Sequence, residues 1–169
     1  MTSDWQIREG ERDDLPALEQ AWRSLYAHHA EVGTAGVPLI PVDERWPARL
    51  HEFEEAFDAE RAVMLVAERA GEVVGFAFST LHEPHPVFDS GPIGELDVLV
   101  VLPAERGRGI GEELVRRSRA ALRERGVGTL KVVVMAGNEA ALRFYSRLGI
   151  EPALIDLLAP IEEPAGDSR

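Results

Sequence analysis

The 169-residue chain contains no cysteine. This absence excludes a thiol nucleophile, a cysteine-ligated zinc site and a disulfide framework together. Long hydrophobic runs are also missing, since no stretch approaches the roughly 20 apolar residues that a membrane-spanning helix requires. The first residues, MTSDWQIREGERDD, lack the apolar region of a signal peptide. These absences predict a cytoplasmic protein without a membrane partner.

Positive charge is scarce, with 18 lysines and arginines against 30 acidic residues and a formal net charge of −12. A protein that binds duplex nucleic acid needs a basic face to displace counterions from the phosphates. The acidic balance therefore argues against a nucleic-acid partner and fits a cationic one, such as an amine.

The hydrophobic content of 45% and the charged content of 28% are typical of a soluble folded protein, and no tract is of low complexity. The length suits one domain and is short for two. We expect residues 1–158 to form this domain and residues 159–169 to form a flexible tail.

Hydrophobic periodicity and turn residues predict the secondary structure. The expected strands lie at 4–9, 62–68, 72–81, 93–103, 129–135 and 153–158, and the expected helices at 13–32, 43–58, 110–125 and 138–148. The resulting order, β-α-α-β-β-β-α-β-α-β, is typical of an α/β (α+β) protein in which helices cover a mixed sheet.

The most informative stretch is AERGRGIGEEL, residues 104–114, which places three glycines and two arginines between an apolar strand and a helix. At such a junction several backbone N–H groups are unpaired beside the positive end of the helix. Glycine allows a phosphate to approach the backbone, and Arg106 and Arg108 add positive charge. The stretch predicts a phosphate or pyrophosphate site. The alternative is a capped helix with a flexible entry, because Glu112 and Glu113 also suit the helix dipole.

Other phosphate motifs fail on spacing. In G-x-G-x-x-G the last glycine would fall on Glu112 or Leu114, and the chain has neither a Gly-Lys-Ser/Thr loop nor a G-x-S-x-G nucleophile elbow. What remains is R-x-x-G-x-G over Arg106–Gly111, after a strand that ends Val-Leu-Pro. A second motif, NEAALRFYSRLGI, follows at Asn138–Ile150.

With these two motifs the chain resembles the GNAT superfamily of N-acetyltransferases, most clearly over residues 93–149. The resemblance implies a mostly antiparallel mixed sheet and acetyl-CoA as co-substrate, without a metal. It also implies that the backbone of residues 99–101 pairs with the pantetheine arm and that an N–H there polarises the thioester carbonyl. The cofactor-binding residues implied are Leu99, Val100, Val101, Arg106, Gly107, Arg108, Gly109, Ile110, Gly111 and Asn138.

Tyr145 has two interpretations. Together with Ala141, Phe144 and Leu148 it lies on one stripe of the second-motif helix, so the residues alone favour a core tyrosine whose hydroxyl reaches the rim. The family resemblance implies instead that Tyr145 protonates the departing CoA thiolate.

Aminolysis of a thioester requires a neutral amine, and therefore a base. The strand at 93–103 offers Glu95 and Asp97, which the period of two places on one face with Leu99 and Val101. We favour Glu95, whose longer side chain reaches farther. Asp97 could be either the base or a structural hydrogen-bond acceptor, because a buried carboxylate needs a partner.

The sequence thus predicts transfer of an acetyl group from acetyl-CoA to a primary amine, on a small molecule or a protein, by direct attack in a ternary complex. The alternative is a GNAT-like module that binds acyl-CoA without catalysis, as a sensor or interaction partner. The unpaired edge expected beside the last strand would suit a homodimer. The His82–His85 pair, flanked by prolines, is expected to lie in a solvated loop.

Overall fold

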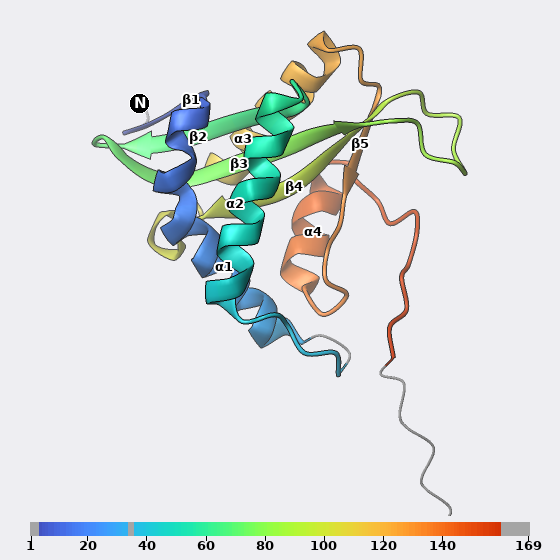
Figure 1. Ribbon diagram of the computed structural model, residues 1–169, viewed down its shortest axis with the longest axis horizontal. Coiled ribbons are helices and arrows are strands. Elements are labelled where there is room, and N and C mark those ends of the chain that lie inside the picture. The colour runs from blue at the N-terminus through green and yellow to red at the C-terminus, as the bar shows by residue number, and fades with distance from the viewer. Residues whose placement is uncertain (1–3, 34–35, 160–169) are drawn as a thin grey trace, which may run out of the picture.

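The computed structural model describes residues 4–33 and 36–159 (Figure 1). In it the strands are β1 (Trp5–Glu9), β2 (Ala62–Arg69), β3 (Glu72–His82), β4 (Ile93–Val101) and β5 (Thr129–Val132). The helices are α1 (Glu19–Val32), α2 (Val42–Asp58), α3 (Ile110–Glu124) and α4 (Glu139–Arg147), with short 3-10 segments at Arg12–Leu18 and Pro103–Glu105. Most of the predicted elements are confirmed within a few residues, and the first predicted helix begins as a 3-10 segment that contains Pro16.

The five strands form one sheet in chain order, β1-β2-β3-β4-β5. Neighbouring strands are antiparallel from β1 to β4, whereas β4 and β5 are parallel. A parallel pair needs a crossover connection, and α3 supplies it. The predicted mixed, mostly antiparallel sheet is therefore confirmed.

Helices cover both faces of the sheet (Figure 1). On one face α1 and α2 bury an aromatic cluster in which Trp22, Trp46 and Phe53 pack with Phe76 and Phe78 of β3. On the other face α3 and α4 bury a second, largely aliphatic cluster. Each helix thus contributes the apolar stripe that its sequence periodicity predicted.

A β-bulge interrupts the pairing of β4 with β3. Val98 lies opposite Phe78 and Leu96 opposite Ser79, so Asp97 is the extra residue. A bulge shifts the alternation of side chains by one position. The prediction that Glu95, Asp97, Leu99 and Val101 share a face is therefore wrong: Leu99 and Val101 pack in the α3–α4 cluster, whereas Asp97 faces α2.

The strands β4 and β5 pair over only part of their length. The ladder joins Ile93–Leu96 to Thr129–Val132 and ends there, so β5 stops short of the predicted residue 135. Beyond the ladder, residues 97–101 of β4 have a strand neighbour on the β3 side alone within the part of the chain that the structure describes. Half of β4 therefore presents an unpaired backbone edge on its other side.

The predicted strand at 153–158 is wrong, because residues 151–159 form no strand. Four of its apolar side chains, Leu154, Ile155, Leu157 and Leu158, are exposed. A short, mostly apolar run such as ALIDLL is compatible with a strand, but a strand also needs a neighbour that completes its hydrogen bonds. Most of the predicted tail, residues 160–169, lies outside the described residues.

Candidate active site

The glycine–arginine turn connects β4 to α3 by two left-handed glycines, Gly107 at φ 78° and Gly109 at φ 80°. The first backbone hydrogen bond of α3 runs from the Glu113 N–H to the Gly109 carbonyl, at 3.1 Å. Within the described residues, the backbone N–H groups from Gly107 to Glu112 have no acceptor. Such a row of free donors at a helix N-terminus suits the oxygens of a phosphate.

The two arginines of the turn are exposed and already engaged. Arg106 Nε donates to the Val101 carbonyl at 3.1 Å and so ties the turn to the end of β4. Arg108 lies 3.3 Å from Glu105 and 3.7 Å from Asp4. The structure thus gives both side chains a role in shaping the turn, and the free donors of the turn are mainly backbone amides.

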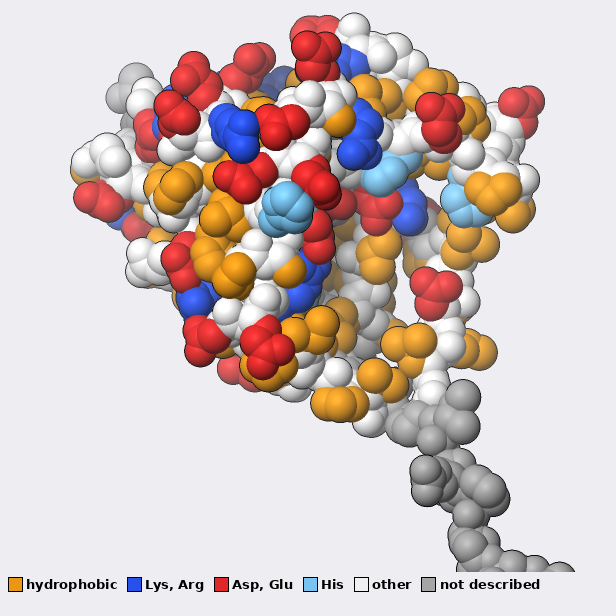
Figure 2. Space-filling model, in the orientation of Figure 1, with side chains coloured by type: hydrophobic (Ala, Val, Ile, Leu, Met, Phe, Trp, Pro, Cys, Tyr) orange, Lys and Arg blue, Asp and Glu red, His pale blue; other side chains and the backbone are white. Residues whose placement is uncertain are grey.

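Helix α4 lies beside the turn and the unpaired half of β4. A Cβ added to Gly111 would lie 3.6 Å from the Phe144 ring and 3.8 Å from Val101. Asn138 caps α4, since its side-chain oxygen accepts from the Ala141 N–H at 3.1 Å. In Figure 2 the surface is hollowed between the main body and the segment that follows α4.

Tyr145 is 9% exposed and packs in the cluster under α3 and α4. Its hydroxyl makes no hydrogen bond within the described part of the chain. Burial raises the pKa of Tyr145 to about 12, because the phenolate is poorly solvated there. The phenol is therefore protonated at neutral pH, as a proton donor must be.

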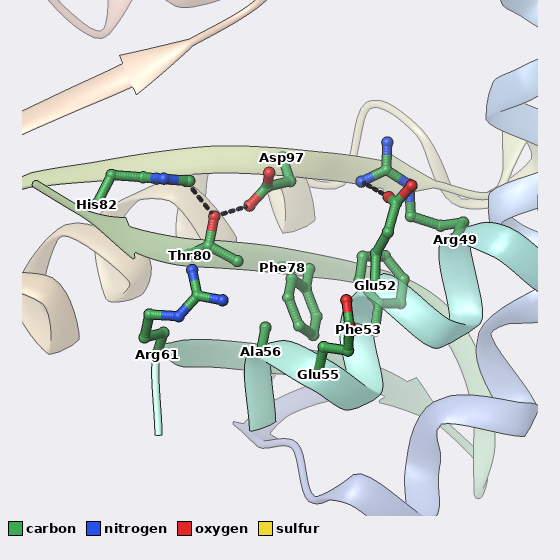
Figure 3. A pocket seen from close by; sticks show the side chains of 10 residues that line it. All are labelled: Arg49, Glu52, Phe53, Glu55, Ala56, Arg61, Phe78, Thr80, His82 and Asp97. Atoms are coloured by element: carbon green, nitrogen blue, oxygen red, sulfur yellow. Dashed lines mark hydrogen bonds and ion pairs between the residues drawn. The ribbon is translucent and has the colours of Figure 1, made fainter. Parts of the chain in front are cut away.

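On the face of the sheet that α2 covers, β3 and β4 border a cavity of about 220 Å³ (Figure 3). Helix α2 provides one wall, β3 and β4 provide the other, and aromatic rings of the core form part of the lining. The lining residues are Arg49, Glu52, Phe53, Glu55, Ala56, Arg61, Phe78, Thr80, His82 and Asp97. The cavity thus brings together two core aromatics, two acids of α2 and one predicted base.

Asp97 projects from the bulge into this cavity and accepts a hydrogen bond from Thr80 Oγ1 at 2.8 Å. Burial raises the pKa of Asp97, and the neighbouring Glu95 carboxylate raises it further, while the Thr80 hydrogen bond and Arg49 oppose the shift. Because the β4–β5 ladder ends at Leu96, Asp97 is the first residue of the unpaired half of β4.

Glu95 lies two positions earlier and is bound differently. Lys131 Nζ of β5 lies 2.9 Å from its carboxylate, and His82 Nε2 lies 3.8 Å from it. Its side chain is 19% exposed. The two predicted bases are thus neighbours, but Glu95 has a cationic partner and Asp97 has a hydroxyl.

Three residues of this site were missed or set aside in the sequence. Thr80 and Arg49 carried no signal, and His82 was assigned to a solvated loop. In the structure His82 is the last residue of β3, and its Nε2 lies 2.7 Å from Thr80 Oγ1. Thr80 and His82 share a face by the period of two. Without the strand register, nothing in the sequence placed that face against Asp97.

Among residues 4–33 and 36–159, no three histidine or acidic side chains gather in a way that could hold a metal ion. No helix in the same ranges has the length and apolar character needed to cross a membrane.

Comparison with known proteins identifies a family and several relatives. The model of the Acetyltransferase (GNAT) family matches residues 18–150. The mycothiol acetyltransferase of Thermobispora bispora is 35% identical over 144 residues, which cover 83% of this chain and 45% of that protein. The mycothiol acetyltransferase of Rhodococcus erythropolis is 32% identical over 149 residues, covering 88% and 46%. The chain thus spans about half the length of these curated relatives.

Solved structures share the fold. The aminoglycoside N-acetyltransferase AAC(6')-Iy in complex with CoA superposes with a TM-score of 0.73 at 22% identity, over 95% of this chain and 97% of that one. A GCN5-related N-acetyltransferase from Ralstonia eutropha gives 0.74 at 22% identity, over 93% and 98%. Together with the family match over residues 18–150, this architecture shows that the chain belongs to the GNAT acetyltransferase family.

Proposed function

We propose that the chain is an N-acetyltransferase that moves an acetyl group from acetyl-CoA to a primary amine by direct attack. The observation that carries this proposal is the row of free amides from Gly107 to Glu112, next to the unpaired half of β4. One feature suits the pyrophosphate of the co-substrate and the other suits its amide-containing pantetheine arm.

Acetyl-CoA fits this place by its chemistry. Among the described residues, no atom beyond the adjoining residues lies within 4 Å of a Cβ added at Gly107 or Gly109, so the turn has open space at both glycines. Arg106, Arg108 and Ile110 belong to the same turn, and Asn138 lies at the start of α4. Along β4 the backbone of Leu99, Val100 and Val101 is available to pair with the pantetheine arm as an added strand would. The co-substrate supplies a thioester, whose acyl carbon is open to attack by an amine.

Asp97 is the residue we assign as the base. Its raised pKa makes the carboxylate a better proton acceptor than an exposed aspartate. Glu95 is held by Lys131 at 2.9 Å, and this ion pair competes with a role as base. The assignment reverses the order expected from side-chain length, because Asp97 lines the cavity and Glu95 does not.

Tyr145 is the acid in this proposal. As the amine nitrogen bonds to the acyl carbon, the carbon–sulfur bond breaks and the thiolate takes a proton from the phenol. One proton leaves the nitrogen for Asp97, and another leaves Tyr145 for the sulfur. A backbone N–H of Leu99, Val100 or Val101 is the donor proposed for the developing oxyanion.

The acceptor is an amine, on a small molecule or a protein. The name of the solved neighbour motivates an aminoglycoside in the acceptor panel, and the acidic balance of the chain motivates a polyamine and a lysine peptide as cationic acceptors. Release of CoA, followed with a thiol reagent, tests the reaction, and calorimetry with CoA tests binding. If CoA gives no binding heat, the proposal is wrong. If CoA binds and no amine is acetylated, the non-catalytic acyl-CoA-binding module becomes the better account.

A further inference from the structure

A chain of hydrogen bonds leads out of the cavity from Asp97. Thr80 Oγ1 donates to Asp97 Oδ2 at 2.8 Å and lies 2.7 Å from His82 Nε2 (Figure 3). Since the hydroxyl proton is given to Asp97, Nε2 carries the proton of the second bond, an assignment that follows from the network. At the far end the His82 side chain is 44% exposed. One residue thus connects a half-buried carboxylate to a solvated imidazole.

Such a connection matters because a base must lose the proton that it has accepted before the next turnover. Asp97 lies among Phe53, Phe78 and Ala56, and a bound acceptor would separate it from water. We propose that Thr80 and His82 form a relay that carries the amine proton from Asp97 to solvent, an inference that rests on the proposed acetyltransfer with Asp97 as base.

The relay balances protons without a further reactant. Once Asp97 holds the amine proton, its O–H donates to Thr80 Oγ1, and the exposed imidazole of His82 exchanges its Nε2 proton for one at Nδ1 through water. The Thr80 hydroxyl then turns toward the free Nε2 of His82. The proton passes from Asp97 to Oγ1, while the original hydroxyl proton passes to Nε2 of the neutral imidazole. The imidazolium then releases its Nδ1 proton to water. Asp97 is a carboxylate again, and Thr80 has regained its hydroxyl proton.

The charges around the imidazole support this path. Glu95 lies 3.8 Å from Nε2 and would stabilise the imidazolium while the proton is in transit. Lys131, which binds the same carboxylate, limits this effect. The other charged groups that line the cavity are Arg49, Glu52 and Glu55 of α2 and Arg61, which follows it.

The first test needs no acceptor. In the full chain labelled with ¹⁵N and ¹³C, the Nε2 resonance of His82 should follow the titration of the Asp97 carboxyl carbon. Thr80→Val, which keeps the shape and removes the hydroxyl, should abolish this response, and Thr80→Ser should restore it. An Nε2 resonance that is unchanged by Asp97→Asn and by Thr80→Val would overturn the relay.

The second test is kinetic and uses acetyl-CoA with the amine of the panel that is turned over fastest. We expect His82→Ala and Thr80→Val to lower kcat roughly tenfold, a part of the 10²–10⁴-fold that acid–base catalysis contributes. The KM for acetyl-CoA should not change, and added imidazole should restore activity to His82→Ala in proportion to its concentration. The control His28→Ala, on α1 outside the cavity, should behave as wild type.

The outcomes separate the two proposals. If Asp97→Asn is inactive while Thr80→Val and His82→Ala keep the wild-type kcat and pH profile, the relay is wrong and the acetyltransfer stands. If His82→Ala raises the KM for the amine and imidazole gives no rescue, His82 contacts the acceptor, and the relay is again wrong. Turnover of no amine together with the absence of CoA binding removes the acetyltransfer itself.

Discussion

At the scale of single residues, Tyr145 combines two requirements, since its ring fills the cluster under α4 and its phenol is the proposed acid. Tyr145→Phe keeps the ring and removes only the oxygen. We expect kcat to fall by about 10²-fold, at the lower end of the range for an acid–base group. The melting temperature should stay close to that of the wild type, because the hydroxyl makes no hydrogen bond within residues 4–33 and 36–159. Steady-state kinetics and a thermal melt measure both quantities, and full activity in the variant would remove the proposed role.

The pKa shift of Asp97 predicts opposite effects on activity and stability. The pKa is raised in the folded state, so the folded protein binds this proton more readily than the unfolded chain. Stability is therefore lost as pH rises from the unfolded to the folded pKa. Asp97→Asn should be at least as stable as wild type at pH 7, and this gain should disappear well below pH 4, where both forms are uncharged.

The same variant should lose activity by about 10²-fold or more, because a base must be deprotonated. In the wild type, kcat/KM should fall as the pH drops through the raised pKa, at higher pH than an ordinary aspartate would give. A structural acceptor would behave differently: Asp97→Asn would then lower the melting temperature and leave the pH profile in place. Urea unfolding at several pH values, together with pH–rate profiles, distinguishes these cases.

At the scale of elements, the left-handed glycines of the turn allow a controlled experiment. Gly109 at φ 80° and Gly126 at φ 79° both have open space where a Cβ would stand. An alanine in this conformation costs about 1–2 kcal/mol, so both substitutions should lower stability alike. Only Gly109→Ala should also weaken CoA binding. We expect a loss of about 1.4 kcal/mol in binding free energy, which corresponds to a roughly tenfold higher Kd. Equal CoA affinities in the two variants would argue against a pyrophosphate site in the turn.

Substitutions of Asn138, which caps α4, can likewise distinguish a role in stability from a role in CoA binding. Asn138→Ala should cost about 1 kcal/mol in urea unfolding, because the Ala141 N–H loses its acceptor. Asn138→Asp keeps an oxygen there and should keep the stability. If the Asn138 amide nitrogen contacts the cofactor, the aspartate variant alone should combine wild-type stability with weaker CoA binding in calorimetry. Wild-type affinity in that variant would leave Asn138 with the cap as its role.

The sequence predicts the elements that local patterns determine better than the features that depend on pairing between strands. The helices and the antiparallel strands follow from local periodicity, and the turn at Arg106–Gly111 follows from its spacing. The bulge at Asp97, the short β4–β5 ladder and the place of His82 depend on strand register, which is a property of paired chains. The wrong prediction of a strand at 153–158 shows the same limit, because this apolar run has no strand neighbour among residues 4–33 and 36–159.

At the scale of the whole molecule, the proposed co-substrate site joins parts that the fold holds separately. It comprises the turn before α3, the unpaired half of β4 and the start of α4, and the chain carries a formal net charge of −12 around it. An anionic ligand must therefore gain its affinity from local donors against an unfavourable overall field. The homodimer expected from the sequence stays a prediction beside this site, and the four exposed apolar residues of 154–158 are where it would be sought.

A ligand that binds only the folded state stabilises it, by about 2.7 kcal/mol at a concentration of 100 times its Kd. For a domain of this length each kcal/mol corresponds to roughly 2–4 °C, so CoA at that concentration should raise the melting temperature by roughly 5–10 °C. Pantetheine, which lacks the pyrophosphate, should give a much smaller shift at the same concentration, because it leaves the amides of Gly107–Glu112 unpaired. An equal shift with pantetheine would mean that the β4 edge alone provides the affinity, and the turn would then lose its assigned role.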